Sequence, residues 1–305
     1  MKKPTLPHKR TKSAEHHYFP KSLQRYWRNP EGLVHRRNSR GEIKTSKNGT
    51  FGQIRNAHRI QIADVPTVWD ESFEYIFGRA DTGFRELIEL FENSVRLSSA
   101  NVGDISARFL PVWQFEQDSS LLSECIASLV VRSPGFRNSI RVGVQPFHDG
   151  PVPDHLISGN QRHVLTDYAK AMSQRGKYIF MTAGEGEFIF GDGMLNNFRS
   201  GGPPSPFNPR CLVPLTPQLA IGYDCPSSYS VPGRFMSIQL SKQEVDEINF
   251  YTMVYSKEHI YYRSQCPQDL TELERSAFQQ FQYHDPEWLV DIFTAASNSR
   301  FQRPA

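Results

Sequence analysis

The sequence has no long apolar run and few cysteines. Its longest apolar stretch, residues 125–131, is far shorter than the roughly 20 residues that a membrane-spanning helix needs. The basic N-terminus lacks the apolar core of a signal peptide. We therefore expect a soluble, cytoplasmic protein with no membrane partner. The four cysteines stand far apart without a CxxC pair, which argues against a structural zinc site and implies no disulfide framework: Cys125, Cys211, Cys225 and Cys266.

Common catalytic motifs are also missing. The chain contains no GxGxxG or GK[ST] phosphate loop and no GxSxG elbow, so nucleotide-binding and hydrolase folds lose support. What is present is a hydrophobic fraction of 38% and an aromatic fraction of 12% in 305 residues. That composition can fill a sizeable core and argues against wholesale disorder.

Positive charge is concentrated at the start of the chain. Residues 1–40 hold 11 Lys and Arg against two acids, whereas the whole chain has a net charge of only +3. A basic segment on a slightly acidic body can contact phosphates, and it can equally be a solvated tail. Residues 1–13 have almost nothing to bury, so we expect a flexible arm that is dispensable for folding.

Hydrophobic periodicity predicts an α+β fold. Residues 32–45 resemble a hairpin, and Ser241 with Glu244 forms a capping box before a late helix. Helices are expected at 81–97, from about 104, at 119–132, 163–176 and 241–256, and strands at 177–183, 187–193, 212–217, 220–225 and 235–240. The first two of these strands are expected to pair through the glycine turn at 184–186.

Segregated helices and strands favour a central helical segment with a mixed or antiparallel sheet built from N-terminal and C-terminal strands. We expect residues 14–265 to form a single α+β domain and residues 266–305 to form a C-terminal helical extension.

Five segments together resemble the domain of unknown function 4238 family. They are HHYFPKSLQRYW, RELIELFENSV, SLVVRSPGFRN, EFIFGDG with CLVPLTP, and EVDEINFYTMVYS, in this order between about residues 15 and 260. Where that family has a Thr-Ser-Asp-Asn-Pro-like motif, this chain reads FGDGM at 190–194 and keeps only the aspartate. The resemblance identifies related chains rather than an activity, because the family's function is unassigned.

The adjacent pair His16 and His17 allows several interpretations. It resembles the first half of a ββα-metal nuclease motif, in which such a pair supplies a general base and a metal ligand. Otherwise the pair anchors an entry strand or belongs to a binding surface. In an extended segment the two rings point to opposite sides. Since Phe19 shares a face with His17, alternation favours His16 as the histidine that faces a polar cleft.

Other side chains could complete a metal site with His17. Asp192 ends an expected strand between two glycines, and Glu92 lies one position off the apolar face of the first long helix. These carboxylates are candidate ligands for a divalent ion, Mg²⁺ or Zn²⁺, although a turn aspartate and a solvated glutamate are the ordinary alternatives. Arg132 is a candidate phosphate clamp that could equally hold a buried carbonyl or acid.

The segment QRYWR interleaves aromatic rings with arginines. Trp27 could stack on a base while Arg25 and Arg28 neutralise phosphates, or the rings could belong to the core. Two functional hypotheses follow. The first is a metal-dependent nuclease of a bacterial defence or toxin module, with His16, His17 and Arg132 as its catalytic residues. The second is a non-catalytic module that binds nucleic acid or a protein.

Overall fold

The fold is described from a computed structural model. The residues described are 15–46, 51–55, 59–60, 71–72, 74–94, 103–116, 119–196, 210–225, 233–264, 266 and 287–301. The expected basic arm at residues 1–13 lies outside them.

A six-stranded mixed sheet forms the centre of the molecule, with the order β10-β11-β12-β8-β13-β7. Its neighbours are antiparallel except for the pair formed by β13 and β8, which is parallel. The strands are β7 (Leu110–Pro111), β8 (Lys177–Ala183), β10 (Leu195–Asn196), β11 (Cys211–Thr216), β12 (Leu219–Asp224) and β13 (Phe235–Leu240). β11 and β12 are buried along their whole length, which matches their near-continuous apolar sequence.

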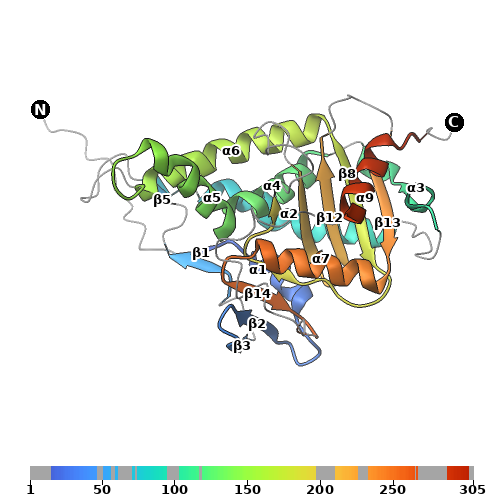
Figure 1. Cartoon of the computed structure of the whole chain (residues 1–305), viewed down its shortest axis with the longest axis horizontal. Coiled ribbons are helices and arrows are strands. Elements are labelled where there is room, and N and C mark those ends of the chain that lie inside the picture. The colour runs from blue at the N-terminus through green and yellow to red at the C-terminus, as the bar shows by residue number, and fades with distance from the viewer. Residues whose placement is uncertain are drawn as a thin grey trace, which may run out of the picture.

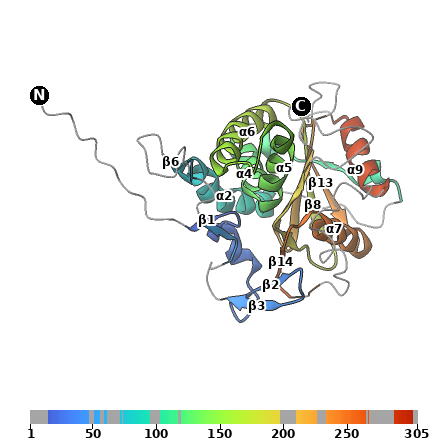
Figure 2. The same cartoon turned by 60° about the vertical axis from the view of Figure 1, so that its left-hand side comes forward.

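Helices cover both faces of this sheet, as Figure 2 shows in a view nearly along its edge. On one side lie α2 (Gly78–Ser94), α4 (Ser120–Arg132), α5 (Pro134–Val144) and α6 (Asp154–Gln174). On the other side lie α7 (Lys242–Tyr255) and α9 (Glu287–Asn298). The short helical segments are α1 (Lys21–Gln24), η1 (Arg25–Trp27), η2 (Glu74–Phe77), α3 (Ile105–Arg108), η3 (Trp113–Phe115) and η4 (Gln145–Phe147). The α+β prediction is confirmed.

Local sequence signals place several helix ends. Ser133 ends α4 and caps α5 by accepting a hydrogen bond from the Phe136 amide, because Pro134 fits the first turn of a new helix. The capping box of α7 is present as predicted. In α2 the predicted apolar face, including Phe84 and Ile88, is buried.

A smaller sheet lies below the main sheet (Figure 1). Its order is β3-β2-β14-β9, from β2 (Val34–Asn38), β3 (Ile43–Ser46), β9 (Phe190–Gly191) and β14 (His259–Tyr262). This sheet joins N-terminal and C-terminal strands, as expected, and contains the predicted hairpin. Two strand pairs lie apart from both sheets: β1 (Glu15–His17) with β4 (Gln53–Arg55), and β5 (Arg59–Ile60) with β6 (Glu71–Ser72).

The predicted hairpin across residues 184–186 is wrong. β8 pairs with β12 and β13 in the main sheet, whereas β9 pairs with β14 in the small sheet. The glycine turn therefore carries the chain from one sheet to the other. The two neighbours of β8 are six-residue, largely apolar strands that are almost wholly buried. They supply more apolar burial than β9, with two strand residues, could supply.

Helix α9 packs into the main core rather than forming an extension from it. Leu289, Ile292, Phe293 and Ala296 are buried in the same cluster as the central sheet. Lys177, at the start of β8, donates hydrogen bonds to the carbonyls of Ala296 and Ser299. No helix in the described part of the chain is both long and apolar enough to cross a membrane.

Candidate functional site

His16 and His17 occupy β1 and differ in exposure. His16 is buried, whereas His17 is half-buried and its Nε2 lies 2.7 Å from the Nε2 of Gln53 on the paired strand. This reverses the preference for His16 that alternation suggested. The reason is that β1 ends at His17: the amides of Tyr18 and Phe19 both donate to the carbonyl of Gly52, so the chain bends and the alternation stops there.

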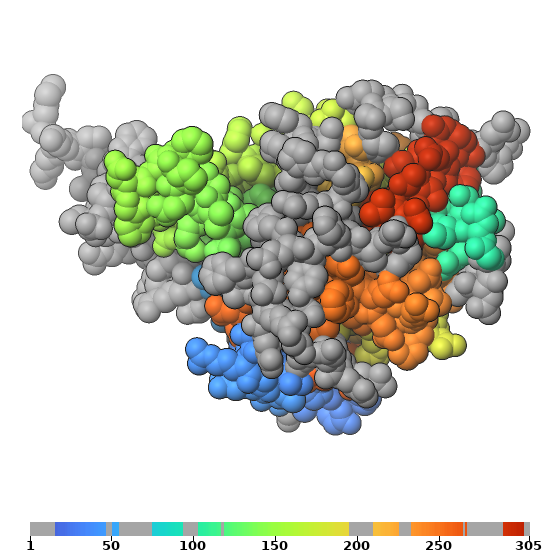
Figure 3. All heavy atoms as spheres, in the orientation of Figure 1, coloured from blue at the N-terminus to red at the C-terminus, as the bar shows by residue number. Residues whose placement is uncertain are grey.

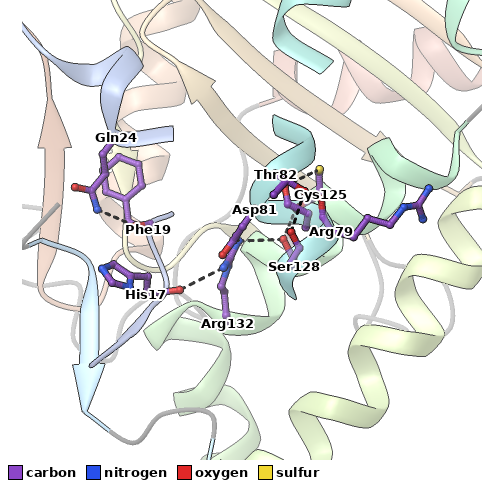
Figure 4. Close-up of polar contacts among 11 residues, drawn as sticks. His17, Phe19, Gln24, Arg79, Asp81, Thr82, Cys125, Ser128 and Arg132 are labelled. Atoms are coloured by element: carbon purple, nitrogen blue, oxygen red, sulfur yellow. Dashed lines mark hydrogen bonds and ion pairs between the residues drawn. The ribbon is translucent and has the colours of Figure 1, made fainter. Parts of the chain in front are cut away.

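Arg132 is fully buried at the end of α4 and connects three elements (Figure 4). Its guanidinium donates to a carboxylate oxygen of Asp81 on α2 at 2.6 Å and to the carbonyl of His17 at 3.3 Å. The guanidinium also lies over the Phe77 ring, 5.0 Å from its centre. Arg132 and His17 are therefore brought together, but through a backbone carbonyl. These contacts match the alternative role of Arg132, in which it holds a buried carbonyl and an acid. They do not match the role of a phosphate clamp.

Asp81, the first residue of the helix expected at 81–97, lies inside α2 rather than at its start. α2 begins three residues earlier, at Gly78, so the carboxylate of Asp81 is one turn into the helix. There it faces α4 and pairs with Arg132. No local pattern could reveal this pair, because its members are 51 positions apart.

Asp192 forms a structural cap, which is the ordinary turn-aspartate role that the sequence also allowed. Its two carboxylate oxygens accept hydrogen bonds from the amides of Lys257, Glu258 and His259, at 2.5 to 3.2 Å. These bonds occupy the acceptor positions of the carboxylate and organise the turn between α7 and β14.

The two glycines beside Asp192 have the same structural explanation. A Cβ atom on Gly193 would collide with the carbonyl of Tyr255, and one on Gly191 would collide with Ser256. These glycines permit the close approach of the end of α7 and the residue after it.

Glu92 is exposed on α2. Among the described residues, no three His, Cys, Asp or Glu side chains gather closely enough to hold a metal ion. The set of His17, Asp192 and Glu92 is therefore not assembled in the described structure. A dependence on Mg²⁺ or Zn²⁺ stays a prediction.

Trp27 belongs to the core, which is the second of the two roles that the sequence allowed. Its ring is fully buried and meets the rings of Phe19 and Phe190 edge-on, and its indole N–H donates to the carbonyl of Leu215 at 3.0 Å. A nucleobase cannot reach it. Arg25 is half-buried and lies over the Tyr26 ring, 4.7 Å from its centre, while Arg28 is exposed.

A buried polar cluster lies behind the small sheet. The hydroxyls of Tyr18 and Tyr261 are 2.6 Å apart, and Phe19 stacks on Phe190 beside them. Burial raises the pKa of both tyrosines, so these phenols remain neutral. This cluster fixes the small sheet to the β1 segment and contains no exposed nucleophile.

Cationic side chains on the N-terminal lobe, defined as residues 21–46, are the most distinctive surface feature. The lobe holds seven Lys and Arg against two Glu. All seven are exposed or half-buried: Lys21, Arg25, Arg28, Arg36, Arg37, Arg40 and Lys44. Within the described residues none of the seven pairs with a carboxylate at 4.0 Å or less, whereas arginines on the helices, such as Arg79, Arg108 and Arg132, do.

A stack of two aromatic rings, which sequence reasoning did not identify, joins the lobe to β14. His35 on β2 stacks on Tyr262 of β14, with ring centres 5.3 Å apart and planes inclined by 14°. The Nε2 of His35 lies 3.1 Å from the side-chain amide of Asn29, which fixes the ring's orientation. The histidine followed by two arginines within the hairpin could have marked this site in the sequence. The stack itself could not be predicted, because Tyr262 is 227 positions away.

A shallow hollow of about 340 Å³ lies between α2, α4 and α6. Its walls are Ile76, Ala80, Glu124, Ser128, Arg162, Leu165 and Thr166. Arg79 pairs with Glu124 at its rim, and the Ser128 hydroxyl accepts a hydrogen bond from Arg132. Glu124 and Ser128 are thus engaged by arginines that do not line the hollow.

Comparison with family models, with curated proteins and with solved structures found no match for this chain. The resemblance to the domain of unknown function 4238 family stays a prediction. Functional inference therefore depends on the chemistry of the described residues.

Proposed function

We propose that the chain is a nucleic-acid-binding module and that the N-terminal lobe contacts the phosphate backbone. One observation carries the proposal: seven Lys and Arg side chains share the lobe, and none is neutralised by a described carboxylate. Figure 3 shows this lobe, in blue, at the lower surface of the molecule. Unpaired cations repel one another, and a polyanion removes that repulsion and releases its own counterions.

The lobe is also held in a fixed shape, which favours specific contact over loose attraction. Arg36 lies over the Phe51 ring at 4.9 Å, and Arg25 lies over Tyr26. The Asn38 side chain accepts from the amides of Arg40 and Glu42 and so orders the hairpin turn. Guanidinium groups in defined positions lose less entropy when they bind phosphate.

Charge reversal tests this proposal. Arg28→Glu with Arg40→Glu changes two exposed cations of the lobe, and Lys170→Glu with Arg300→Glu changes two exposed cations elsewhere. The Kd for a labelled oligonucleotide is measured by fluorescence anisotropy over a series of salt concentrations. The lobe variant should bind at least about tenfold more weakly, with a salt dependence shallower by about 0.7–0.9 per lost phosphate contact. Equal loss in the control variant would contradict the proposal.

Metal-dependent cleavage is the competing hypothesis, and the same protein tests it. The chain is incubated with oligonucleotide and Mg²⁺ or Zn²⁺, with and without a chelator. A binding module leaves the strand intact in every tube. Chelator-sensitive cleavage that disappears in a folded His17→Ala variant would show instead that the nuclease hypothesis is correct.

A further inference from the structure

We infer that the lobe selects single-stranded over double-stranded nucleic acid, because an unpaired base can extend the stack formed by His35 and Tyr262. This inference rests on the proposed function and names its substrate class. It comes from the small sheet's register, the composition of one of its faces, and the distribution of charge around that face.

Thr45, His35 and Tyr262 stand side by side on one face of the small sheet. Thr45 is opposite His35 in the pair β2–β3, and His35 is opposite Tyr262 in the pair β14–β2. Directly opposite residues in antiparallel strands project to the same face. The face therefore runs from an exposed threonine, across a half-buried imidazole, to a buried phenol ring.

This arrangement leaves one side of the imidazole beside a small residue. Tyr262 packs against one side of the His35 ring, and the neighbouring position on the other side is Thr45, whose short side chain is exposed. His35 contacts Tyr262 and, at the edge of its ring, Asn29. As far as the described residues are concerned, a planar base placed above Thr45 would continue the stack without displacing a large side chain.

The surroundings of that position suit a nucleotide. Arg37 and Ile43 are opposite each other on the same face, and Ile43 is 56% exposed. An exposed apolar side chain next to a cation offers contact to a base and to its phosphate. Arg28 and Arg40 lie in the loops at either end of β2 and can follow the backbone of an extended strand.

Duplex nucleic acid cannot make the same contact. Its bases are already stacked and paired, so only its phosphates are available to the lobe. A single strand can offer both its phosphates and the faces of its bases. Stacking on an aromatic ring accepts any base, so we expect preference for strandedness and little preference for sequence.

The test uses four labelled probes of one sequence: a single DNA strand, the same strand as RNA, the annealed DNA duplex, and an abasic strand of equal length. Wild type should bind the two single strands about tenfold more tightly than the duplex or the abasic strand. His35→Ala should remove this difference. His35→Phe, which keeps a ring, should retain it.

Controls separate loss of folding and failure of the proposed function from failure of this inference. His163→Ala removes an exposed histidine on α6 and should leave all four affinities unchanged. Each variant is first checked by its melting temperature. Equal binding of single strand and duplex that is insensitive to His35→Ala, but weakened by charge reversal of the lobe, would overturn the inference alone. No binding to any probe would overturn the proposed function as well.

Discussion

Arg132 and Asp81 show how one residue's environment decides the cost of changing it. The guanidinium is fully buried, whereas the side chain of Asp81 keeps 35% of its surface exposed. Removing the acid leaves a buried cation without its partner, while removing the cation leaves a carboxylate that water can reach. The two halves of this ion pair are therefore not equivalent.

Asp81→Asn should destabilise the protein more than Arg132→Met. For Asp81→Asn we expect a loss of about 3 kcal/mol, at the lower end for broken buried pairs because the acid is partly exposed. Urea denaturation of both variants measures the difference, and an unchanged slope confirms that the unfolded states are comparable. A larger loss of unfolding free energy for Arg132→Met would mean that the contacts of Arg132 with His17 and Phe77 contribute more to stability than the ion pair does.

Lys177 gives a pH dependence with a defined sign. Burial lowers its pKa from 10.5 to about 8. Between these values the unfolded chain holds a proton that the folded chain has released, so this residue's contribution to stability rises with pH. The unfolding free energy of wild type minus that of Lys177→Met should therefore increase from pH 7.5 to 9.5. Ionisation of the buried thiols of Cys125, Cys211 and Cys225 affects the stability of both proteins equally, so it cancels in this difference. A constant difference would refute the assignment.

At the scale of elements, α4 is the helix around which the helical layer is packed. It contacts α2 and α6, and ten of its 13 residues are buried. Leu122, Ile126 and Leu129 have no measurable exposure. Because no neighbour is free to collapse into a gap, changes in this helix should be costly.

Leu129→Ala should cost about 2–5 kcal/mol in unfolding free energy, since it leaves a cavity among closely packed side chains. Chemical denaturation measures this loss. A cost below about 1 kcal/mol would show that the site relaxes and that the packing is looser than described.

The four cysteines provide an independent measure of the same packing. Burial raises the pKa of Cys125, Cys211 and Cys225, and all three are buried, whereas Cys266 is half-buried. A thiol reagent should label only Cys266 rapidly in the native protein, and all four cysteines after unfolding. Mass spectrometry identifies the labelled residue, and rapid native labelling of Cys125 would contradict the burial of α4.

At the scale of the whole molecule, the C-terminal helix is part of the main core. α9 buries four apolar side chains in the main cluster and is held by the ammonium group of Lys177. Removing residues 287–305 should therefore prevent stable folding, which thermal melting and solubility would show. A truncated chain with native stability would restore the earlier interpretation of this region as an extension.

Local patterns determined much of the secondary structure. Hydrophobic periodicity predicted a helix at 81–97, where most of α2 lies, and a helix that ends at residue 132, where α4 ends. The Ser241–Glu244 box predicted the start of α7. These signals succeed because helix periodicity, capping and proline geometry depend on residues within a turn or two of one another. The concentration of positive charge in the first 46 residues was likewise visible in the sequence.

Tertiary structure decided what the individual polar and aromatic residues do. Trp27 enters the core through contacts with Phe190 and Leu215, and Asp192 is satisfied by amides 65 or more positions away. The lobe's cations have no described carboxylate within reach, and His35 meets Tyr262, only because of how distant segments fold together. A side chain's burial and partners are sums over long-range contacts, and a single sequence carries no local signal for them.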